Sequence, residues 1–433
     1  MKKVTPVFLA LLLTISCQKD PINIVDEANS NCTDCNIEIT KDASRLELFD
    51  SNVNIIKSTY SKSSKIVADT IDLVLKAKLN PLIVNYNGRE VLLNANHVAV
   101  RSNRVAVSYS IVGEPYGGAI DIIDIPKNKN VTLEGTLLIP DKDIDAVDFD
   151  SRTRLMFGGG LNVDLFPNAN SSSFFEYYSL KGQTKKPKDF NLKKLFSFTE
   201  RFGNKLNSIK DLYGTIIGSG GGNDGTIFIY NKKEKKVFLD QSNVMSGLFI
   251  FDTSVTKQNG NNVFIAVAYN NNSKELKAFY YDINSKTSDL SFKYEVSLGN
   301  WNLNVEAKHS IMAPKSNVLI VSLEQEGIGV FKLQETNGIE NASLVQQVKD
   351  EILDPNNPDE VVNSFSYYKR VVYAAAGAGG ILILPYSNKK LKLSYEYKVE
   401  LPGESVNSTL RKNDNLVVGS TSGVWIFKMS KKN

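Results

Sequence analysis

From residue 94 to the end of the chain, short apolar runs alternate with turns rich in Gly, Asn and Pro. In the first set of such runs, apolar residues alternate at His97–Arg101 and Arg104–Ser110, and two further runs follow at Ala119–Ile125 and Val131–Ile139. Short β-branched runs broken by turn residues are typical of antiparallel strands joined in hairpins. Four such strands in succession predict one blade of a β-propeller.

The same order of runs recurs with a spacing of about 40 to 60 residues, which is the range of propeller repeats. The later copies begin near Asp145, Asn207, Ser246, His309, Asn363 and Asn407. The chain is therefore predicted to be all-β, a β-propeller of about seven four-stranded blades. The last copy ends after three strands, and an unpaired edge would favour aggregation. We expect the ring to be closed by an N-terminal strand at Ile71–Leu79.

The first 16 residues predict a cleaved export signal. Lys2 and Lys3 precede an apolar run over residues 6–16, which is too short to span a bilayer, since that needs about 20 residues. The run ends in Leu13-Thr14-Ile15-Ser16-Cys17, which resembles a bacterial lipobox with Thr14 in place of the usual Leu. The resemblance implies that Cys17 is the lipid attachment site. A plain secretory signal with an incidental cysteine is the alternative.

The residues after Cys17 predict where the protein is located. Gln18-Lys19-Asp20 resembles the short charged tag that sends some Gram-negative lipoproteins to the outer face of the outer membrane. We therefore expect an outer membrane lipoprotein, held by its lipid and facing the cell exterior. Residues 17–50 are predicted to be a lipidated polar tether, residues 51–93 a leading segment with the closing strand, and residues 94–433 the blades. In an oxidising compartment, Cys32 and Cys35 are expected to form a local disulfide, with a redox or metal role as the alternatives.

The third run of each copy carries a family resemblance. Ile122-Ile123-Asp124-Ile125 resembles the LVIVD repeat of bacterial surface and secreted propeller proteins, although Tyr230 and Pro385 replace the aspartate in other copies. The resemblance extends over residues 94–430. It implies a propeller fold and no particular reaction.

Composition and charge limit the classes of ligand. Lys and Arg total 51 against 47 Asp and Glu, so the net charge of +4 indicates no nucleic-acid partner. Three cysteines and two histidines disfavour zinc, iron and copper sites. Asp141, Asp143 and Asp145 imitate the start of an EF-hand loop, but Ala146 and Arg152 occupy the positions that need Gly and Glu. No cofactor is expected, and a looser site for calcium or another divalent cation at Asp143, Asp145 and Asp148 is left open.

The strand order predicts a candidate binding site at the mouth of the central channel. The start of each first strand and the loop between the second and third strands lie on one face, here called the top. Seven polar residues are expected there: His97, Asp145, Asn207, Ser246, His309, Asn363 and Asn407. Tyr116, Phe166 and Trp301 are expected to border this site, and Leu161–Ser173 is the candidate contact loop. The alternative is that these polar groups only bond adjacent blades and ordered water.

No catalytic constellation is found in the sequence. His97 and His309 are expected four blades apart, and no G-x-S-x-G motif is present. We therefore expect a surface-exposed, non-catalytic lipoprotein that binds a protein, peptide or glycan on the top face. One alternative is a metal-assisted propeller hydrolase or lactonase centred on His97, Asp145 and His309. Another is a structural component of an envelope assembly.

Overall fold

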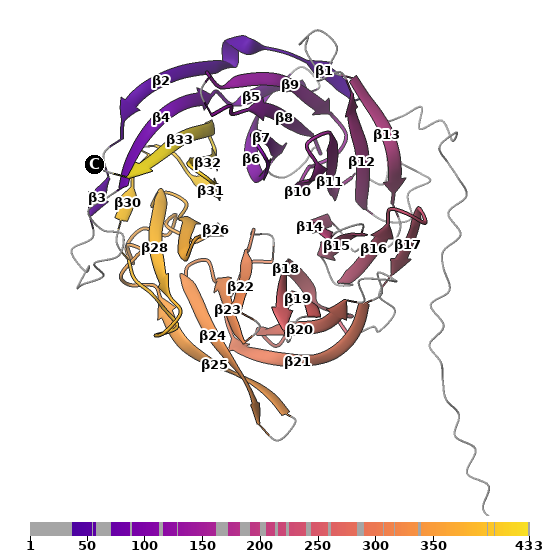
Figure 1. Ribbon diagram of the computed structural model, residues 1–433, viewed down its shortest axis with the longest axis vertical. Helices are drawn as coiled ribbons and strands as arrows, with labels where there is room; N and C mark the ends of the chain where they lie inside the picture. Colours follow the sequence, from indigo (N-terminus) through magenta and orange to yellow (C-terminus); the bar gives the residue numbers. More distant parts are fainter. Residues whose placement is uncertain are drawn as a thin grey trace, which may run out of the picture.

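The computed structural model describes residues 37–53, 55–57, 71–86, 89–111, 116–127, 129–161, 172–181, 191–199, 205–212, 215–221, 225–239, 244–258, 261–283, 290–305, 307–315, 317–336, 339–395, 397–401 and 403–431. Within these ranges, no helix has the length and apolar character needed to cross a membrane. Seven antiparallel sheets surround a central axis, as Figure 1 shows. The prediction of an all-β propeller with seven blades is confirmed.

The strands of each blade follow one another from the axis outwards. Blade 1 contains β6 (Arg89–Arg101), β7 (Arg104–Ser110), β8 (Gly118–Asp124) and β9 (Thr132–Ile139). Blade 2 contains β10 (Ala146–Ser151), β11 (Arg154–Gly160), β12 (Ser173–Lys181) and β13 (Asn191–Phe198). Blade 3 contains β14 (Lys205–Leu212), β15 (Thr215–Gly221), β16 (Thr226–Asn231) and β17 (Lys236–Leu239). Blade 4 contains β18 (Phe249–Gln258), β19 (Asn261–Asn270), β20 (Glu275–Ile283) and β21 (Leu290–Asn300).

The remaining blades follow the same plan with additions at the outer edge. Blade 5 contains β22 (Ile311–Lys315), β23 (Val318–Ser322), β24 (Ile328–Thr336) and β25 (Ile339–Val348). Blade 6 contains β26 (Ser364–Tyr368), β27 (Val371–Ala375), β28 (Ile381–Ser387) and β30 (Tyr397–Val399), with β29 (Lys392–Leu393) on β28 and β3 (Ile56–Lys57) outside β30. Blade 7 contains β31 (Val406–Lys412), β32 (Asn415–Ser420), β33 (Gly423–Lys431) and β4 (Ile71–Leu79), with β2 (Leu46–Asn52) outside β4.

Both faces of each blade are buried against neighbouring blades. In β7, alternate residues such as Val105 and Ala106 point to opposite faces, yet every residue of the strand is buried. Val105 belongs to an apolar cluster shared with blade 7, and Ala106 to one shared with blade 2. Seven clusters of this kind fill the seven junctions between blades. This explains why the middle strands are continuous apolar runs rather than alternating ones.

The predicted closing strand is confirmed. β4 pairs antiparallel with β33 along its whole length, from Val424 opposite Leu79 to Lys431 opposite Ile71. It supplies the fourth strand of blade 7, so β4, near the start of the chain, lies beside β33, the last strand (Figure 1). The edge left open by three C-terminal strands is thereby covered.

A buried ion pair fastens the closing segment to blade 1. Arg45, at the end of the one-turn 3-10 helix η2 (Ala43–Arg45), contacts both carboxylate oxygens of Asp121 at 3.1 and 2.9 Å. Tyr109 and Thr136 donate hydrogen bonds of 2.6 and 2.5 Å to the same carboxylate. Arg45 also donates to the carbonyl of Asn80, directly after β4. The carboxylate of Asp121 is fully buried, so Arg45 is its main charge compensation.

The boundary predicted at residue 51 lies too far along the chain. β1 (Glu38–Thr40) pairs with β9 of blade 1, and β2 pairs with β4, so the propeller begins inside the predicted tether. Both are outer strands with one face in water. Their sequences are therefore polar and cannot be distinguished from a tether by composition. A further hairpin, in which β5 (Leu82–Tyr86) pairs with the first half of β6, extends blade 1 and was absent from the sequence-based expectation.

Replacing the buried arginine tests the closure of the ring. Arg45→Met leaves the Asp121 carboxylate buried without a cation, and we expect the free energy of unfolding to fall by about 3–5 kcal/mol. Denaturant unfolding followed by intrinsic fluorescence measures this change. The control is Lys293→Gln, which removes a partly exposed pair with Asp282 and is expected to cost less than about 1 kcal/mol. Equal losses in the two variants would show that Arg45 has no special role.

Candidate functional site

A polar cavity occupies the mouth of the channel at the top face. Its volume is about 710 Å³. The residues that line it include four of the seven predicted at the start of the first strands, namely Asp145, Asn207, Asn363 and Asn407. Their common placement follows from the ring geometry, because each inner strand begins at the same height beside the axis.

Asparagine side chains at this level connect blade 3 to blade 4, blade 6 to blade 7 and blade 7 to blade 1. Asn207 Nδ2 donates to the carbonyl of Ile250 in blade 4 at 2.7 Å, and Asn363 Nδ2 donates to that of Val406 in blade 7 at 3.0 Å. Asn407 Nδ2 donates to the carbonyl of Ala95 in blade 1 at 3.2 Å. The amides of these three residues therefore join blades, which is the structural alternative considered for the predicted polar ring.

Each of the three accepting carbonyls lies directly before a β-bulge. The pairing register shifts after Ala95, Ile250 and Val406, so the next residue in each inner strand leaves the ladder. The skipped residues are Asn96, Phe251 and Asn407, and all three line the cavity. The same shift after Leu206 skips Asn207. The bulges in blades 1, 3, 4 and 7 thus each turn one side chain towards the mouth, and an asparagine of the preceding blade donates to the carbonyl before three of them.

Blades 2, 4 and 5 depart from the asparagine pattern. The corresponding residues are Asp145 in blade 2, Phe251 in blade 4 and His309 in blade 5. The ring of His309 stacks on Phe251 with centroids 3.7 Å apart. The neighbouring Lys308 then enters the cavity and donates from Nζ to the Asp145 carbonyl at 3.1 Å, across the channel from blade 5 to blade 2. A lysine bridge therefore spans the mouth where the blade-joining amides are missing.

Two charged groups at the mouth, Lys308 and Asp143, have pKa values near neutral pH. Burial lowers the pKa of Lys308 to about 7, opposed by Asp145 and Asp252 and reinforced by Lys210 and Lys205. Burial likewise raises the pKa of Asp143 to about 7, against the hydrogen bond that its carboxylate accepts from the Gly117 N–H at 3.0 Å. The site can therefore hold or release a proton close to pH 7.

Neither histidine is among the residues that line the cavity. His97 accepts a hydrogen bond at Nδ1 from the Val147 N–H in blade 2, and burial lowers its pKa well below the usual value. His309 contacts the Ser322 carbonyl through Nδ1, and Glu324 and the Asn304 carbonyl through Nε2. Asn96, next to His97, lines the cavity in its place. Ser246 is exposed before β18, and Phe251 takes the position predicted for it. The predicted positions of His97 and Ser246 are therefore wrong in register.

The predicted aromatic border is only partly present. Tyr116 lines the cavity. Trp301 instead packs edge-on against Phe331 and donates from Nε1 to the Leu298 carbonyl at 2.9 Å, between blades 4 and 5. Phe166, most of the predicted contact loop, and Cys17, Cys32 and Cys35 lie outside the described residues. Phe251 and Lys308 were missed because the first is apolar and the second precedes the strand.

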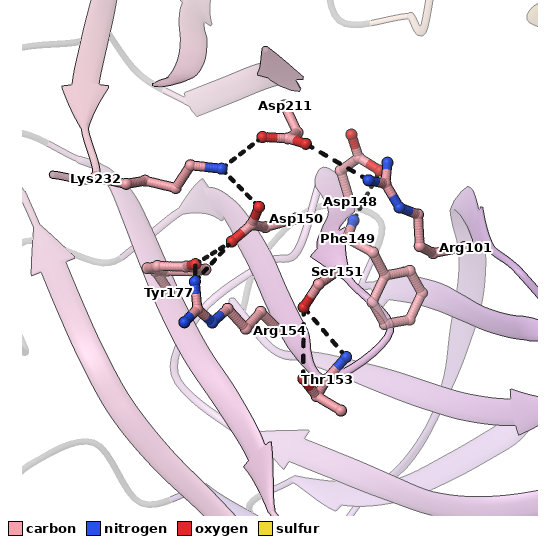
Figure 2. A network of polar contacts seen from close by, with 10 residues as sticks. All are labelled: Arg101, Asp148, Phe149, Asp150, Ser151, Thr153, Arg154, Tyr177, Asp211 and Lys232. Atoms are coloured by element: carbon pink, nitrogen blue, oxygen red, sulfur yellow. Dashed lines mark hydrogen bonds and ion pairs between the residues drawn. The ribbon is translucent and has the colours of Figure 1, made fainter. Parts of the chain in front are cut away.

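A second polar network lies at the bottom ends of β10 and β14, and Figure 2 draws its side chains. Lys232 Nζ bridges Asp150 and Asp211 at 2.6 and 2.7 Å, and Arg154 and Tyr177 also contact Asp150. Burial raises the pKa of the nearby Asp148 to about 6. Across the described ranges, no three His, Cys, Asp or Glu side chains form a group that could hold a metal ion. Asp143, Asp145 and Asp148 are thus not gathered at one point, and the lower network joins blades through paired charges.

The comparisons with known proteins concern the fold. No protein-family model matches the chain, and no curated protein matches it. Among solved structures, the crystal structure of RRP9 WD40 repeats is similar, with a TM-score of 0.51 and 8% sequence identity. The match covers 81% of this chain and 97% of that chain. At this identity the likeness shows a WD40-like β-propeller fold and nothing about the ligand.

The lysine at the mouth predicts a pH-dependent stability. The unfolded chain holds the Lys308 proton up to about pH 10.4, whereas the folded chain loses it near pH 7. Between these values the unfolded state binds more protons, so stability rises with pH, by on the order of 1 kcal/mol per pH unit. Denaturant unfolding at pH 7, 8 and 9 should show this rise in the wild type and a weaker rise in Lys308→Met. Parallel curves would contradict the assignment, whereas Asp145→Asn should lower the pKa of Lys308 further.

Proposed function

We propose that the chain is an exported, non-catalytic lipoprotein that binds a protein, peptide or glycan on the top face of its propeller. The lipid on Cys17 would hold it to the outer membrane, facing the cell exterior. The lipobox-like Ile15-Ser16-Cys17, the following Gln18-Lys19-Asp20 and the LVIVD-like third strands support this location. The propeller fold is consistent with a role in protein binding.

One observation carries the binding site. In blades 3, 6 and 7, an asparagine at the mouth is used to join blades. Blades 2, 4 and 5 instead bring Asp145, Phe251 and Lys308 into one cavity. The equivalent positions in blades 3, 6 and 7 carry no charge. Charged groups that the blade junctions do not need, gathered in a concavity, are typical of a recognition site rather than of a structural one.

The cavity combines groups suited to a polar partner. Lys308 and Lys205 are cationic donors, Asp143 and Asp145 are acceptors, and Phe251 and Tyr116 offer aromatic surface. Such a set fits a loop tip, a chain terminus or a sugar with several hydroxyl groups. About 710 Å³ is enough for a few residues or sugar units.

The hydrolase alternative finds less support. It requires His97, Asp145 and His309 to converge on one metal or water. The ring nitrogens of His309 contact Ser322, Asn304 and Glu324. The Nδ1 atom of His97 is used by the backbone of Val147. The third possibility, a structural component of an envelope assembly, makes no use of the charged mouth.

The predicted tether joins the propeller on the same face as the cavity. β1 runs antiparallel to β9, and Ile139 at the end of β9 lies at the top, so the chain arrives at the top rim of blade 1. Residues 18–36 span at most about 65 Å when fully extended. That length exceeds the thickness of a blade, so a tethered propeller would be free to turn its mouth away from the membrane.

Removing the lipid acceptor tests the proposed location. In the source bacterium or a Gram-negative host, the wild type should incorporate an alkyne-labelled fatty acid and fractionate with the outer membrane. Cys17→Ser should lose the label and most of the membrane association, because one or no acyl chain anchors weakly. Cys32→Ser is the matched control and should keep both. Labelling of Cys17→Ser would contradict the assignment.

Substitution at the mouth tests the binding site. The full-length chain in nonionic detergent is screened on arrays of synthetic peptides and bacterial envelope glycans. Binding is measured at about pH 6, where Lys308 is protonated; Lys308→Gln removes the charge that spans the mouth, and we expect at least about tenfold weaker binding of the hits, since a hydrogen bond to a charged group contributes about 1.5–3 kcal/mol. Lys274→Gln, an exposed lysine in a top loop of blade 4, is the control. Hits that both variants bind equally would place the site elsewhere.

A further inference from the structure

The face opposite the mouth carries a groove of about 930 Å³ between blades 7 and 1. Its lining comes from the bottom turns of blades 1, 6 and 7 and from the lower ends of β2, β4 and β33. Five lysines line it against two aspartates: Lys76, Lys127, Lys129, Lys369 and Lys428 against Asp50 and Asp414. Lys76 is paired with Asp50 at 2.5 Å, and the other four lysines are exposed. The groove is therefore strongly cationic.

The turn at one end of the groove is strained. Tyr368 pairs with Val371, so Lys369 and Arg370 form a two-residue hairpin turn. Both have positive φ, at 50° and 68°, as a type I′ turn requires. Asn-Gly is the usual choice there, because long side chains are disfavoured in the left-handed region. Two adjacent cations therefore occupy a turn whose preferred residues are uncharged.

The top connections around blades 5, 6 and 7 are acidic, opposite in sign to the groove on the bottom face. The top connections between blades 5, 6 and 7 expose Asp350, Glu351, Asp354, Asp359 and Glu400. The bottom turns of blades 6, 7 and 1 expose Arg370, Lys412 and Lys127, beside the groove lysines. An anionic ligand is thus attracted to one face and repelled by the other.

We propose that this groove binds an anionic polysaccharide. Carboxylate or sulfate groups of the polymer would pair with Lys127, Lys129, Lys369 and Lys428. The ring of Tyr368 lies within 5.2 Å of Lys369 Nζ and 5.7 Å of the Arg411 guanidinium carbon, which places aromatic surface beside cations. Asparagine amides of the lining supply donors and acceptors for sugar hydroxyls.

The shape of the groove favours a polymer chain over a membrane. A bilayer is flat, and a protein that binds it firmly inserts apolar side chains in addition to pairing charges. The turn tips at residues 102–103, 369–370 and 413–414 carry only polar or charged residues. The exposed Leu48 lies within the lining rather than at a tip. A concave cationic strip with amides and the two aromatic rings of Phe49 and Tyr368 matches a single polysaccharide chain. This inference does not depend on the proposed mouth ligand or on the lipid.

The test separates binding from stability. The double variant Lys369→Asn/Arg370→Gly removes two cations and installs the preferred turn sequence, so its melting temperature should equal or exceed that of the wild type. Binding of the full-length chain to polygalacturonate and to heparin is measured by biolayer interferometry at 50 and 200 mM NaCl. The double variant should bind about tenfold more weakly, and wild-type affinity should fall with salt. Lys233→Gln/Lys235→Gln, in the bottom turn of blade 3, is the control and should stay within about twofold.

Several results would overturn the proposal. One is absence of wild-type binding to both polysaccharides at 50 mM NaCl. Another is an equal loss in the blade 3 control, which would indicate attraction without a site. Equal or tighter binding to phosphatidylglycerol vesicles, to duplex DNA or to poly-glutamate would assign the groove to a different partner class.

Discussion

The fold depends on the fact that no blade has a face left for water. Each middle strand is buried on both sides, as β7 shows, and each apolar cluster is shared by two blades. A blade without both neighbours would expose one of these clusters, so stability requires a closed ring. Two features close the ring. β4 adds the fourth strand to blade 7, and Arg45, which precedes β2, forms an ion pair with Asp121 of blade 1. At the junction between the last blade and the first, distant parts of the chain are fastened by charge as well as by packing.

Closing seven sheets around an axis also determines what the centre is made of. The inner strands converge there, and in several blades a bulge takes one residue out of the ladder. The carbonyl beside the bulge needs a donor, which asparagines of the preceding blade supply. Polarity at the mouth is therefore first a structural necessity. Functional meaning attaches to the departures from it, where Asp145 and Lys308 bring charge that the blade junctions do not require.

The sequence could predict the repeat, the seven blades and the closing strand, because these follow from apolar periodicity and from a last copy that lacks a strand. It could not predict β1 and β2, since an outermost strand with one face in water reads as polar chain. At the mouth, the positions of Asn207, Asn363 and Asn407 could be predicted, because an asparagine recurs at the start of the first strand in these three copies of the repeat. Those of Phe251 and Lys308 could not, since their inward direction comes from a bulge and from the path of a connecting loop. His97 was misplaced by one residue for the same reason, because a bulge reverses which neighbour faces the axis.

The two proposed sites have different physical characters and lie on opposite faces. The mouth mixes charges of both signs in a cavity at the channel axis, and its protonation changes near pH 7, which suits recognition of a defined end or tip. The groove is open and cationic, which suits a polymer of repeated negative charge. Because the acidic top connections repel such a polymer, the two ligands would not compete, and the rigid ring fixes the separation between them. On the proposed function, the chain is tethered at the mouth side, so the groove lies on the face away from the attachment point. A propeller so arranged would hold a partner at its mouth and a polysaccharide in its groove at the same time, with no movement of the blades required.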